Sequence, residues 1–270
     1  MSEKVESAFR ELPPLPETAM KLIRTVNDAR AGANEIVGIL KTDVALTTEV
    51  LRRANSPLYG LAAKVSSASQ AVMLLGTDEI RRVATSISLA RHFGGAHAGI
   101  RRLWRHAFAR ALVAERLASA AGVGTETAYT AGLLADIGIY GLMVSFQVEE
   151  QRVMELAPTV EALLLAEERE FGVNHCQAGE WLAQHWRLPE PIVKAVAAHH
   201  DAPHGTSVAA AVYWADGATA HAGFGVRGPN PTRTDLTAYR ELRQQAPFAH
   251  SALPEEPEEL SKWLSQRVPN

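Results

Sequence analysis

The residues best suited to chemistry in this sequence are a few histidines and aspartates in apolar, helix-like segments. Imidazole and carboxylate groups can hold a divalent metal ion when several of them converge on one point. The simpler alternative is structural, because a buried carboxylate must be paired and a histidine on an apolar helix face is commonly a hydrogen-bonded core residue. The single cysteine, Cys176, is interpreted as a small core residue, and no glycine-rich phosphate loop and no Ser–His–Asp order is present. The candidate residues are His106, Asp136, His175, His199, His200 and Asp216.

Each candidate lies in or beside a segment whose apolar residues recur at helical spacing. His106 lies in the segment 100–121. Asp136 lies at the edge of a buried face in the segment 128–146, which is the most apolar. Gly138 and Gly141 are expected to loosen that helix. No strand-like alternation exceeds a few residues, so the sequence predicts an all-α fold. The helices expected here span residues 100–121, 128–146, 158–171, 176–186 and 207–222, with a further helix starting at Pro189 and leading to His199.

A helix–loop–helix is predicted from Asp43 to Gly76. The Asp43 carboxylate can cap the first helix, and Asn55-Ser56-Pro57 stops it because proline disfavours the α region in the residue before it. Ser67 and Gln70 have the spacing of a capping box at the start of the second helix. We interpret the loop at Asn55 as a structural turn, in which the Asn55 side chain satisfies the end of the helix before it.

Three ordered motifs in this part of the chain are DVALTTEVLRRANSPLYG, AVMLLGTDEIRRV and the earlier LPPLPETAMKLIRTV. Together they resemble the HDOD domain, a non-catalytic relative of the HD phosphohydrolases, and the resemblance continues to about residue 225. It implies an HDOD-type helical bundle, in which an N-terminal helical subdomain packs on a degenerate HD-like subdomain. The expected division is 1–98, 99–225 and a helical tail at 226–270, with a break in the GGAHAG segment at residues 94–99.

The resemblance also suggests why histidine and aspartate recur. HD hydrolases hold a divalent metal with a helical His, a His-Asp pair, sometimes further His residues, and a late Asp. By that resemblance His106 matches the first His and Asp136 matches the Asp of the pair, whereas Ala135 replaces the histidine that should precede it. His175, His199 and His200 resemble the additional histidines of the two-metal branch, and Asp216 matches the last aspartate.

Because alanine offers no ligand, we expect no metal, no cofactor and no catalytic residue, and these six positions are vestigial. Asp136 then needs a polar partner, for which His106 is the best candidate, with Asp216 close enough to share the network. His199 and His200 could instead lie at a solvated helix end, where histidine suits the helix dipole.

Composition limits the remaining functions. The chain has 270 residues, 47% of them hydrophobic, and a formal net charge of −3, so it has no overall attraction for nucleic acid or anionic membranes. One cysteine excludes an internal disulfide, and no signal peptide is visible. The apolar stretch AGLLADIGIYGLMVSF contains Asp136 and is too short to span a bilayer. We expect a cytoplasmic protein.

The family resemblance implies a stand-alone bacterial signalling or regulatory protein that binds a protein partner and has no catalytic activity. Two alternatives remain open: a metal-dependent phosphohydrolase with an altered HD ligand set, and a receptor that binds a second-messenger nucleotide in the vestigial active-site cleft. Metal analysis distinguishes the first alternative, and nucleotide-dependent thermal shifts distinguish the second.

Overall fold

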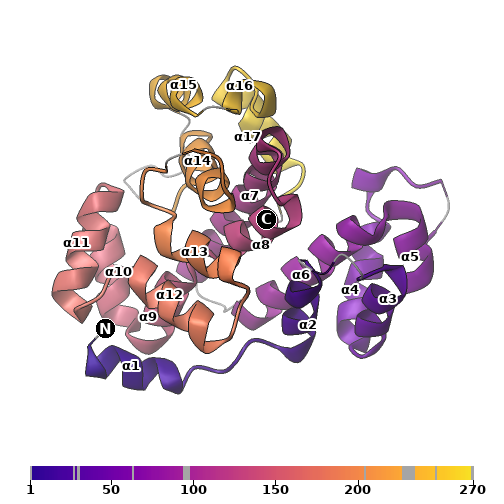
Figure 1. Ribbon diagram of the computed structural model, residues 1–270, viewed down its shortest axis with the longest axis horizontal. Helices are drawn as coiled ribbons and strands as arrows, with labels where there is room; N and C mark the ends of the chain where they lie inside the picture. The colour runs from indigo at the N-terminus through magenta and orange to yellow at the C-terminus, as the bar shows by residue number, and fades with distance from the viewer. Residues whose placement is uncertain are drawn as a thin grey trace. The chain divides into compact units, whose positions relative to one another are not determined.

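The computed structural model describes residues 2–26, 28, 31–62, 64–93, 98–203, 205–226, 235–246 and 248–268. Within these ranges the chain forms helices joined by turns and no extended strand, so the all-α prediction is confirmed (Figure 1). The chain separates into two compact units. One contains residues 15–94, and the other contains residues 1–14 together with 95–270. The predicted break at residues 94–99 falls largely on residues 94–97, which lie outside the described ranges.

The smaller unit is a set of helices around one apolar core. Helices α3 and α4 pack on α5, and α2 and α4 pack on α6. Leu22, Ile36, Leu46, Val50 and Ile80 are all fully buried in this core. The helices are α2 (Glu17–Thr25), α3 (Ala33–Lys41), α4 (Val44–Ala54), the 3-10 turn η1 (Pro57–Tyr59), α5 (Ala68–Leu75) and α6 (Thr77–Phe93).

The helix–loop–helix has the expected form. Asp43 caps α4 by accepting the Leu46 N–H at 2.8 Å, and Ser67 caps α5 by accepting the Gln70 N–H at 3.1 Å. The second half of the predicted capping box is displaced by one residue, because the Gln70 Oε1 accepts the Ser66 N–H.

Asn55 holds the loop from both sides. Its Nδ2 donates to the Leu51 carbonyl at 2.7 Å and to the Val65 carbonyl at 2.8 Å, while its Oδ1 accepts the Val65 N–H at 2.8 Å. These contacts are those of a structural turn.

The larger unit is built around the long helix α7. Helices α8 and α14 pack on α7, α13 packs on α8 and α14, and α12 packs on α9 and α13. The helices are α1 (Glu3–Arg10), α7 (Ala98–Ala121), α8 (Thr125–Leu134), α9 (Ile137–Ser145), α10 (Gln147–Leu156), α11 (Val160–Phe171), α12 (His175–His185), α13 (Glu190–Ala198), α14 (Val208–His221), α15 (Leu236–Gln245), α16 (Ala249–Ala252) and α17 (Pro257–Ser265).

The helix predicted over 128–146 is broken, but not at its glycines. α8 ends at Leu134 and α9 starts at Ile137, so Ala135 and Asp136 form the turn between them. Gly138 instead allows a close approach to α12, because a Cβ on it would lie 1.9 Å from the His175 carbonyl oxygen. The stretch 125–145 is long and apolar enough to cross a membrane, but 94% of its most apolar window is buried inside the protein.

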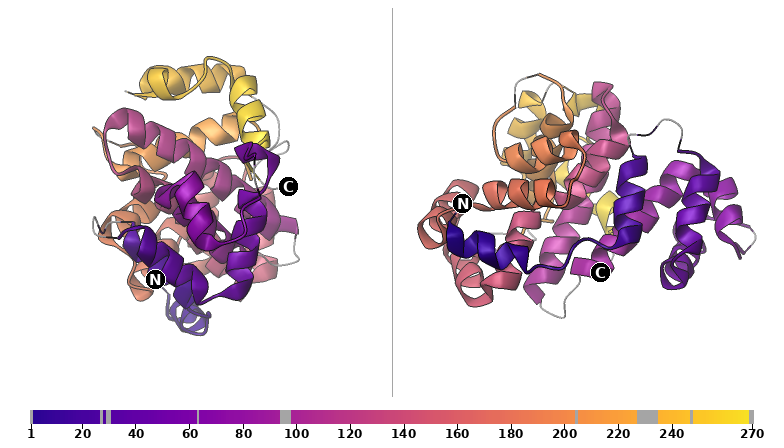
Figure 2. Two further views of the ribbon diagram at one scale, coloured as in Figure 1. Left: turned by 90° about the vertical axis from the view of Figure 1, so that its right-hand side faces the viewer. Right: turned by 60° about the horizontal axis from the view of Figure 1, so that its bottom comes forward.

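Residues at both ends of the chain belong to this unit. Helix α1 packs on α9 at the indigo start of the chain (Figure 2). The Phe9 ring is 6.1 Å from the Trp181 ring. The predicted division put residues 1–98 together, whereas the first 14 residues pack with the larger unit because Phe9 and Val5 supply an apolar face for it. The tail helices also pack here, α15 and α17 on α14 and α16 on α7.

Candidate functional site

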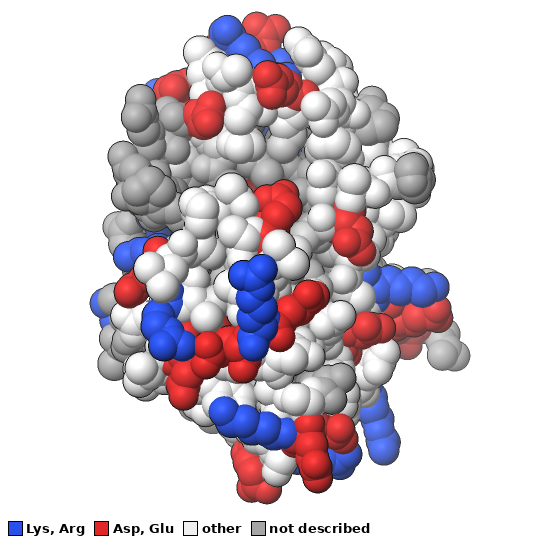
Figure 3. All heavy atoms as spheres, turned by 90° about the vertical axis from the view of Figure 1, so that its left-hand side faces the viewer, with Lys and Arg blue, Asp and Glu red and all other residues white. Residues whose placement is uncertain are grey.

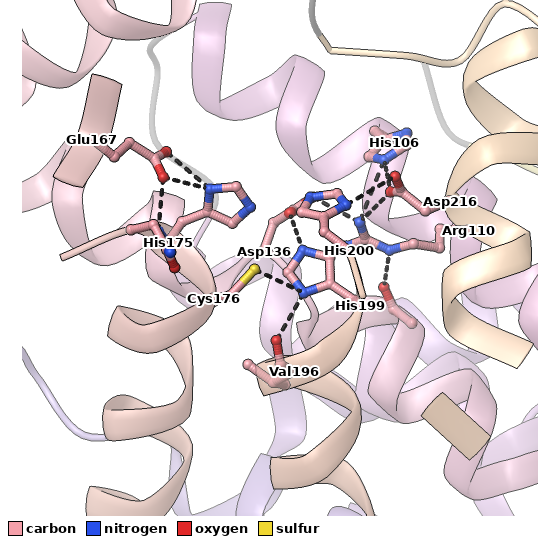
Figure 4. Close-up of polar contacts among 12 residues, drawn as sticks. His106, Arg110, Asp136, Glu167, His175, Cys176, Val196, His199, His200 and Asp216 are labelled. Carbon is pink, nitrogen blue, oxygen red and sulfur yellow. Dashed lines mark hydrogen bonds and ion pairs between the residues drawn. The ribbon is translucent and has the colours of Figure 1, made fainter. Parts of the chain in front are cut away.

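All six candidate residues lie in the larger unit, and all are buried or nearly so. α7 carries His106, and α14 carries Asp216. The His106 Nε2 lies 2.8 Å from the Asp216 Oδ1, and its Nδ1 lies 2.9 Å from the carbonyl oxygen of Phe224 (Figure 4). Because a carbonyl oxygen only accepts, Nδ1 carries a proton. Gly223, with φ +85°, turns the chain after α14 and brings the Phe224 carbonyl back to α7.

Arg110 is the unexpected member of this group. It lies one turn after His106 on α7 and is fully buried. Its Nη1 donates to the Asp136 Oδ2 and to the Asp216 Oδ1, both at 2.8 Å, and its Nε donates to the Gly132 carbonyl at 2.9 Å. Burial lowers the pKa of Arg110, but the two carboxylates outweigh burial, so its pKa is raised. We call His106, Arg110, Asp136 and Asp216 the carboxylate centre.

The partner predicted for Asp136 was wrong. His106 pairs with Asp216, whereas Asp136 is bound by Arg110 and by the His199 Nε2 at 3.2 Å. Burial raises the pKa of Asp136, but Arg110 first and His199 next hold it well below the usual range. The pKa of Asp216 is also well below its usual range, because His106 outweighs the effect of burial. Both groups are carboxylates, and their charge is balanced inside the protein.

This arrangement leaves no place for a metal ion at the carboxylate centre. Donor atoms of His106, Asp136 and Asp216 lie within 4.8 Å of one another. The Arg110 Nη1 lies in the same space, at 2.8 Å from each carboxylate and 3.4 Å from the His106 Nε2. A divalent ion bound by carboxylates stands about 2.0–2.6 Å from their oxygens, so it would collide with a cation of the same sign. Ala135 offers no further ligand. The residues present do not fit a metal here.

The remaining candidates form a second group on the other side of Asp136. His175 and Cys176 open α12, whose start is fixed by a capping box between Asn174 and Gln177. His199 and His200 follow the end of α13. One donor atom from each of the four lies within 4.8 Å of all the others (Figure 4). We call His175, Cys176, His199 and His200 the thiol–histidine cluster.

His199 and His200 do not form a solvated helix end. His199 is fully buried, and the His200 side chain is 6% exposed. The His199 Nδ1 lies 2.7 Å from the Val196 carbonyl, and its Nε2 faces Asp136. Burial lowers the pKa of His199, but Cys176 and Asp136 outweigh it and raise the pKa to about 9. Packing of α13 against α8, α12 and α14 encloses this helix end, which a single-helix pattern does not show.

Two buried glutamates stand behind His175. Glu167 on α11 accepts the His175 backbone N–H at 2.7 Å and lies 2.7 Å from its Nδ1. Glu150 on α10 is also fully buried. Burial and the neighbouring charge of Glu167 raise the pKa of Glu150 to about 9. Glu150 therefore holds a proton near neutral pH, while Glu167 accepts from His175.

Sequence reasoning missed Arg110, Glu150 and Glu167, and two of the three left a detectable signal. Arg110 follows His106 by four residues in RHAFARAL, so both share one helix face that is otherwise apolar. Glu167 lies four residues after Leu163 on the buried face of its own helix. Glu150 lay in a segment for which no helix was predicted, although α10 spans it.

Comparison with known proteins gives the family. The chain matches the model of the HDOD domain over residues 12–202, and it belongs to the HDOD family. It is similar to an HDOD domain protein of unknown function from Geobacter sulfurreducens, with 26% identity, a TM-score of 0.72, and coverage of 97% of this chain and 94% of that chain. A Marinobacter aquaeolei VT8 protein, whose name suggests signal transduction, has the same fold at 22% identity and a TM-score of 0.69, with 98% of this chain and 62% of that chain covered.

An uncharacterized protein of Treponema pallidum (strain Nichols) is 26% identical over 212 residues, which cover 76% of this chain. The match spans 40% of the length of that curated relative.

Proposed function

We propose that this chain is a signalling or regulatory protein that works by binding another protein and does not catalyse hydrolysis. The observation that carries the proposal is the position of Arg110, whose Nη1 lies 2.8 Å from both carboxylates of the carboxylate centre. A hydrolase of the HD type needs a metal ion there to activate water. Arg110 cannot make room for a metal ion by losing its proton, because the pKa of its guanidinium is far above neutral and is raised further here.

The partner is expected to be a protein and not a nucleic acid. On the face drawn in Figure 3, acidic and basic side chains are interspersed, and this face shows no continuous basic patch of the kind that binds phosphate backbones. The net charge of −3 agrees with this. The name of the Marinobacter protein supports a signalling role by analogy of fold alone. A second-messenger nucleotide remains the alternative ligand, and we expect a cytoplasmic location.

The direct test measures hydrolysis and binding together. Purified full-length protein is incubated with bis-p-nitrophenyl phosphate and with cyclic dinucleotides, in the presence of Mn²⁺, Mg²⁺ or Fe²⁺. We expect no turnover and no nucleotide-dependent thermal shift. Cross-linking in the native host, followed by mass spectrometry, should then recover a protein partner. Turnover that is abolished by Asp136→Ala would show that the chain is an enzyme, and a saturable shift with one nucleotide would show a receptor.

A further inference from the structure

Helices α10 and α11 enclose a cleft outside the carboxylate centre and the thiol–histidine cluster. The two helices pack side by side in the larger unit (Figure 1). The cleft has a volume of about 280 Å³, and its apolar lining includes Leu156 of α10 together with Ala162 and Ala166 of α11. A cavity of about 150 Å³ already holds a benzene ring. The cleft is therefore large enough for one large apolar side chain of another molecule.

The apolar side chains at the mouth of this cleft are exposed. Leu156 is 75% exposed, and Leu165, which lies one turn after Ala162 on α11, is 53% exposed. Val148, two turns before Leu156 on the same face of α10, is 77% exposed. Exposed apolar side chains that gather around a cleft are typical of a surface that binds another protein.

The charge at the rim of the cleft is positive. Three charged residues line it: Arg152, Arg169 and Glu170. The Arg152 Nη2 lies 2.8 Å from the Glu170 Oε2, so these two charges balance each other. The Arg169 side chain is exposed and makes no ion pair or hydrogen bond within the part of the chain that the structure describes. One uncompensated cation therefore stands beside the apolar cleft.

The exposed glutamates of the two helices do not cancel this charge at the cleft. Glu161 and Glu168 each directly precede a residue of α11 that lines the cleft, and Glu155 directly precedes Leu156. One residue along an α-helix is a rotation of about 100°, so these carboxylates lie on the flanks of the two helices. None of the three lines the cleft.

We propose that this cleft binds a segment of a partner protein that inserts one large apolar side chain and places an aspartate or glutamate on Arg169. The apolar side chain would be buried against Leu156 and the two alanines, and the carboxylate would match the one free charge of the rim. Arginine and large apolar anchors supply most of the binding energy in such interfaces. This inference rests on the proposed function, because it names the surface and the partner chemistry through which the protein would act.

The test measures the binding of labelled helical peptides to the full-length protein by fluorescence polarisation. Each peptide carries a central leucine, phenylalanine or tryptophan on an alanine-rich helix. One series has glutamate one turn from this anchor, and a matched series has lysine there. We expect saturable binding of the glutamate series, and binding of the lysine series that is at least about 10-fold weaker.

Two variants separate the apolar contact from the charge. Leu156→Ser should weaken the binding of the glutamate peptides by about 10-fold. Arg169→Glu should reverse the preference, so that the lysine peptides bind more tightly than the glutamate peptides, a result that a misfolded variant would not give. Val44→Ser and Arg52→Glu, at exposed positions of the smaller unit, are the matched controls and should bind as wild type does.

Three results would overturn the proposal: no saturable binding of any peptide, equal binding of the two series, or wild-type affinity in Leu156→Ser. Sedimentation analysis tests a different occupant of the cleft. A wild-type dimer that Leu156→Ser dissociates would show that a second copy of this chain covers the cleft, and it would also overturn the proposal.

Failure of this inference is distinguishable from failure of the proposed function. A protein partner that cross-links equally well to wild type, Leu156→Ser and Arg169→Glu would overturn the assignment of the cleft and leave the proposed function intact. Phosphodiester turnover would instead contradict the proposed function, and the peptide titrations would still decide whether the cleft binds its ligand.

Discussion

The Nη1 of Arg110 and the Oδ1 of Asp216 lie 2.8 Å apart in the interior of the larger unit. The same nitrogen lies 2.8 Å from Asp136, so one cation bridges two buried carboxylates. Isolated charges of this kind are costly to bury, and each becomes acceptable only because the other is present. The guanidinium therefore supplies the positive charge that a metal ion supplies in a hydrolytic centre.

Removing that cation should be strongly destabilising. Arg110→Met preserves much of the side-chain volume but leaves Asp136 and Asp216 without it, so we expect a loss of about 3–5 kcal/mol in the free energy of unfolding at pH 7, measured with urea. The loss should shrink as the pH falls toward 4 and below, where protonation removes the uncompensated charges. Arg102→Met on the exposed face of α7 is the control, with an expected change within about 0.5 kcal/mol. An equal loss in both variants would show that the buried ion pairs contribute nothing.

Restoring the missing histidine should not by itself restore a metal site. Ala135→His should bind no manganese, because Arg110 still occupies the centre. Combining Ala135→His with Arg110→Ala should allow binding, measured by elemental analysis after gel filtration. Manganese bound by Ala135→His alone, in stoichiometric amount, would show that Arg110 does not block the site.

The fold was largely predictable because helical periodicity is a local property of the sequence. The break at Ala135–Asp136 was not, since it depends on how α8 and α9 pack against α7 and α12. Gly138 looked like a weak point within one helix, but its missing side chain serves the contact with the His175 carbonyl. The short helix α1 was missed for the same reason, because Phe9 and Val5 find their partners far along the chain.

The site was predictable in its membership but not in its pairing. The sequence placed His106, Asp136 and Asp216 together, as the structure does. It could not show that Arg110 would enter between the carboxylates, because an arginine four residues from a histidine is usually solvated. Cys176 is buried, as expected for a small core residue, and its thiol lies 3.8 Å from the His199 Nδ1, a contact that the sequence did not show.

The turn at Asn55 makes a stability prediction in the smaller unit. Asn55→Ala removes three hydrogen bonds that join Leu51 and Val65, so we expect a loss of about 1–2 kcal/mol in the free energy of unfolding by urea titration. Asn34→Ala is the control, since Asn34 is exposed inside α3. A variant that unfolds like wild type but no longer captures the cross-linked partner would make this loop an interaction surface instead of a turn.

Glu150 makes a prediction about pH. Its pKa is about 9 in the folded protein against an ordinary value of 4.5, because it is buried beside Glu167. Between these values the folded protein holds a proton that the unfolded chain has released, so the contribution of Glu150 to the free energy of unfolding falls as the pH rises from about 4.5 to about 9.

Glu150→Gln keeps the shape and removes the titration, so it should stabilise the protein by a few kcal/mol at pH 8 and by much less at pH 5. Urea titrations at the two pH values measure the difference, and Glu155→Gln at an exposed position of the same helix should leave it unchanged. If Glu150→Gln shifted stability equally at both pH values, Glu150 would not be carrying the proton.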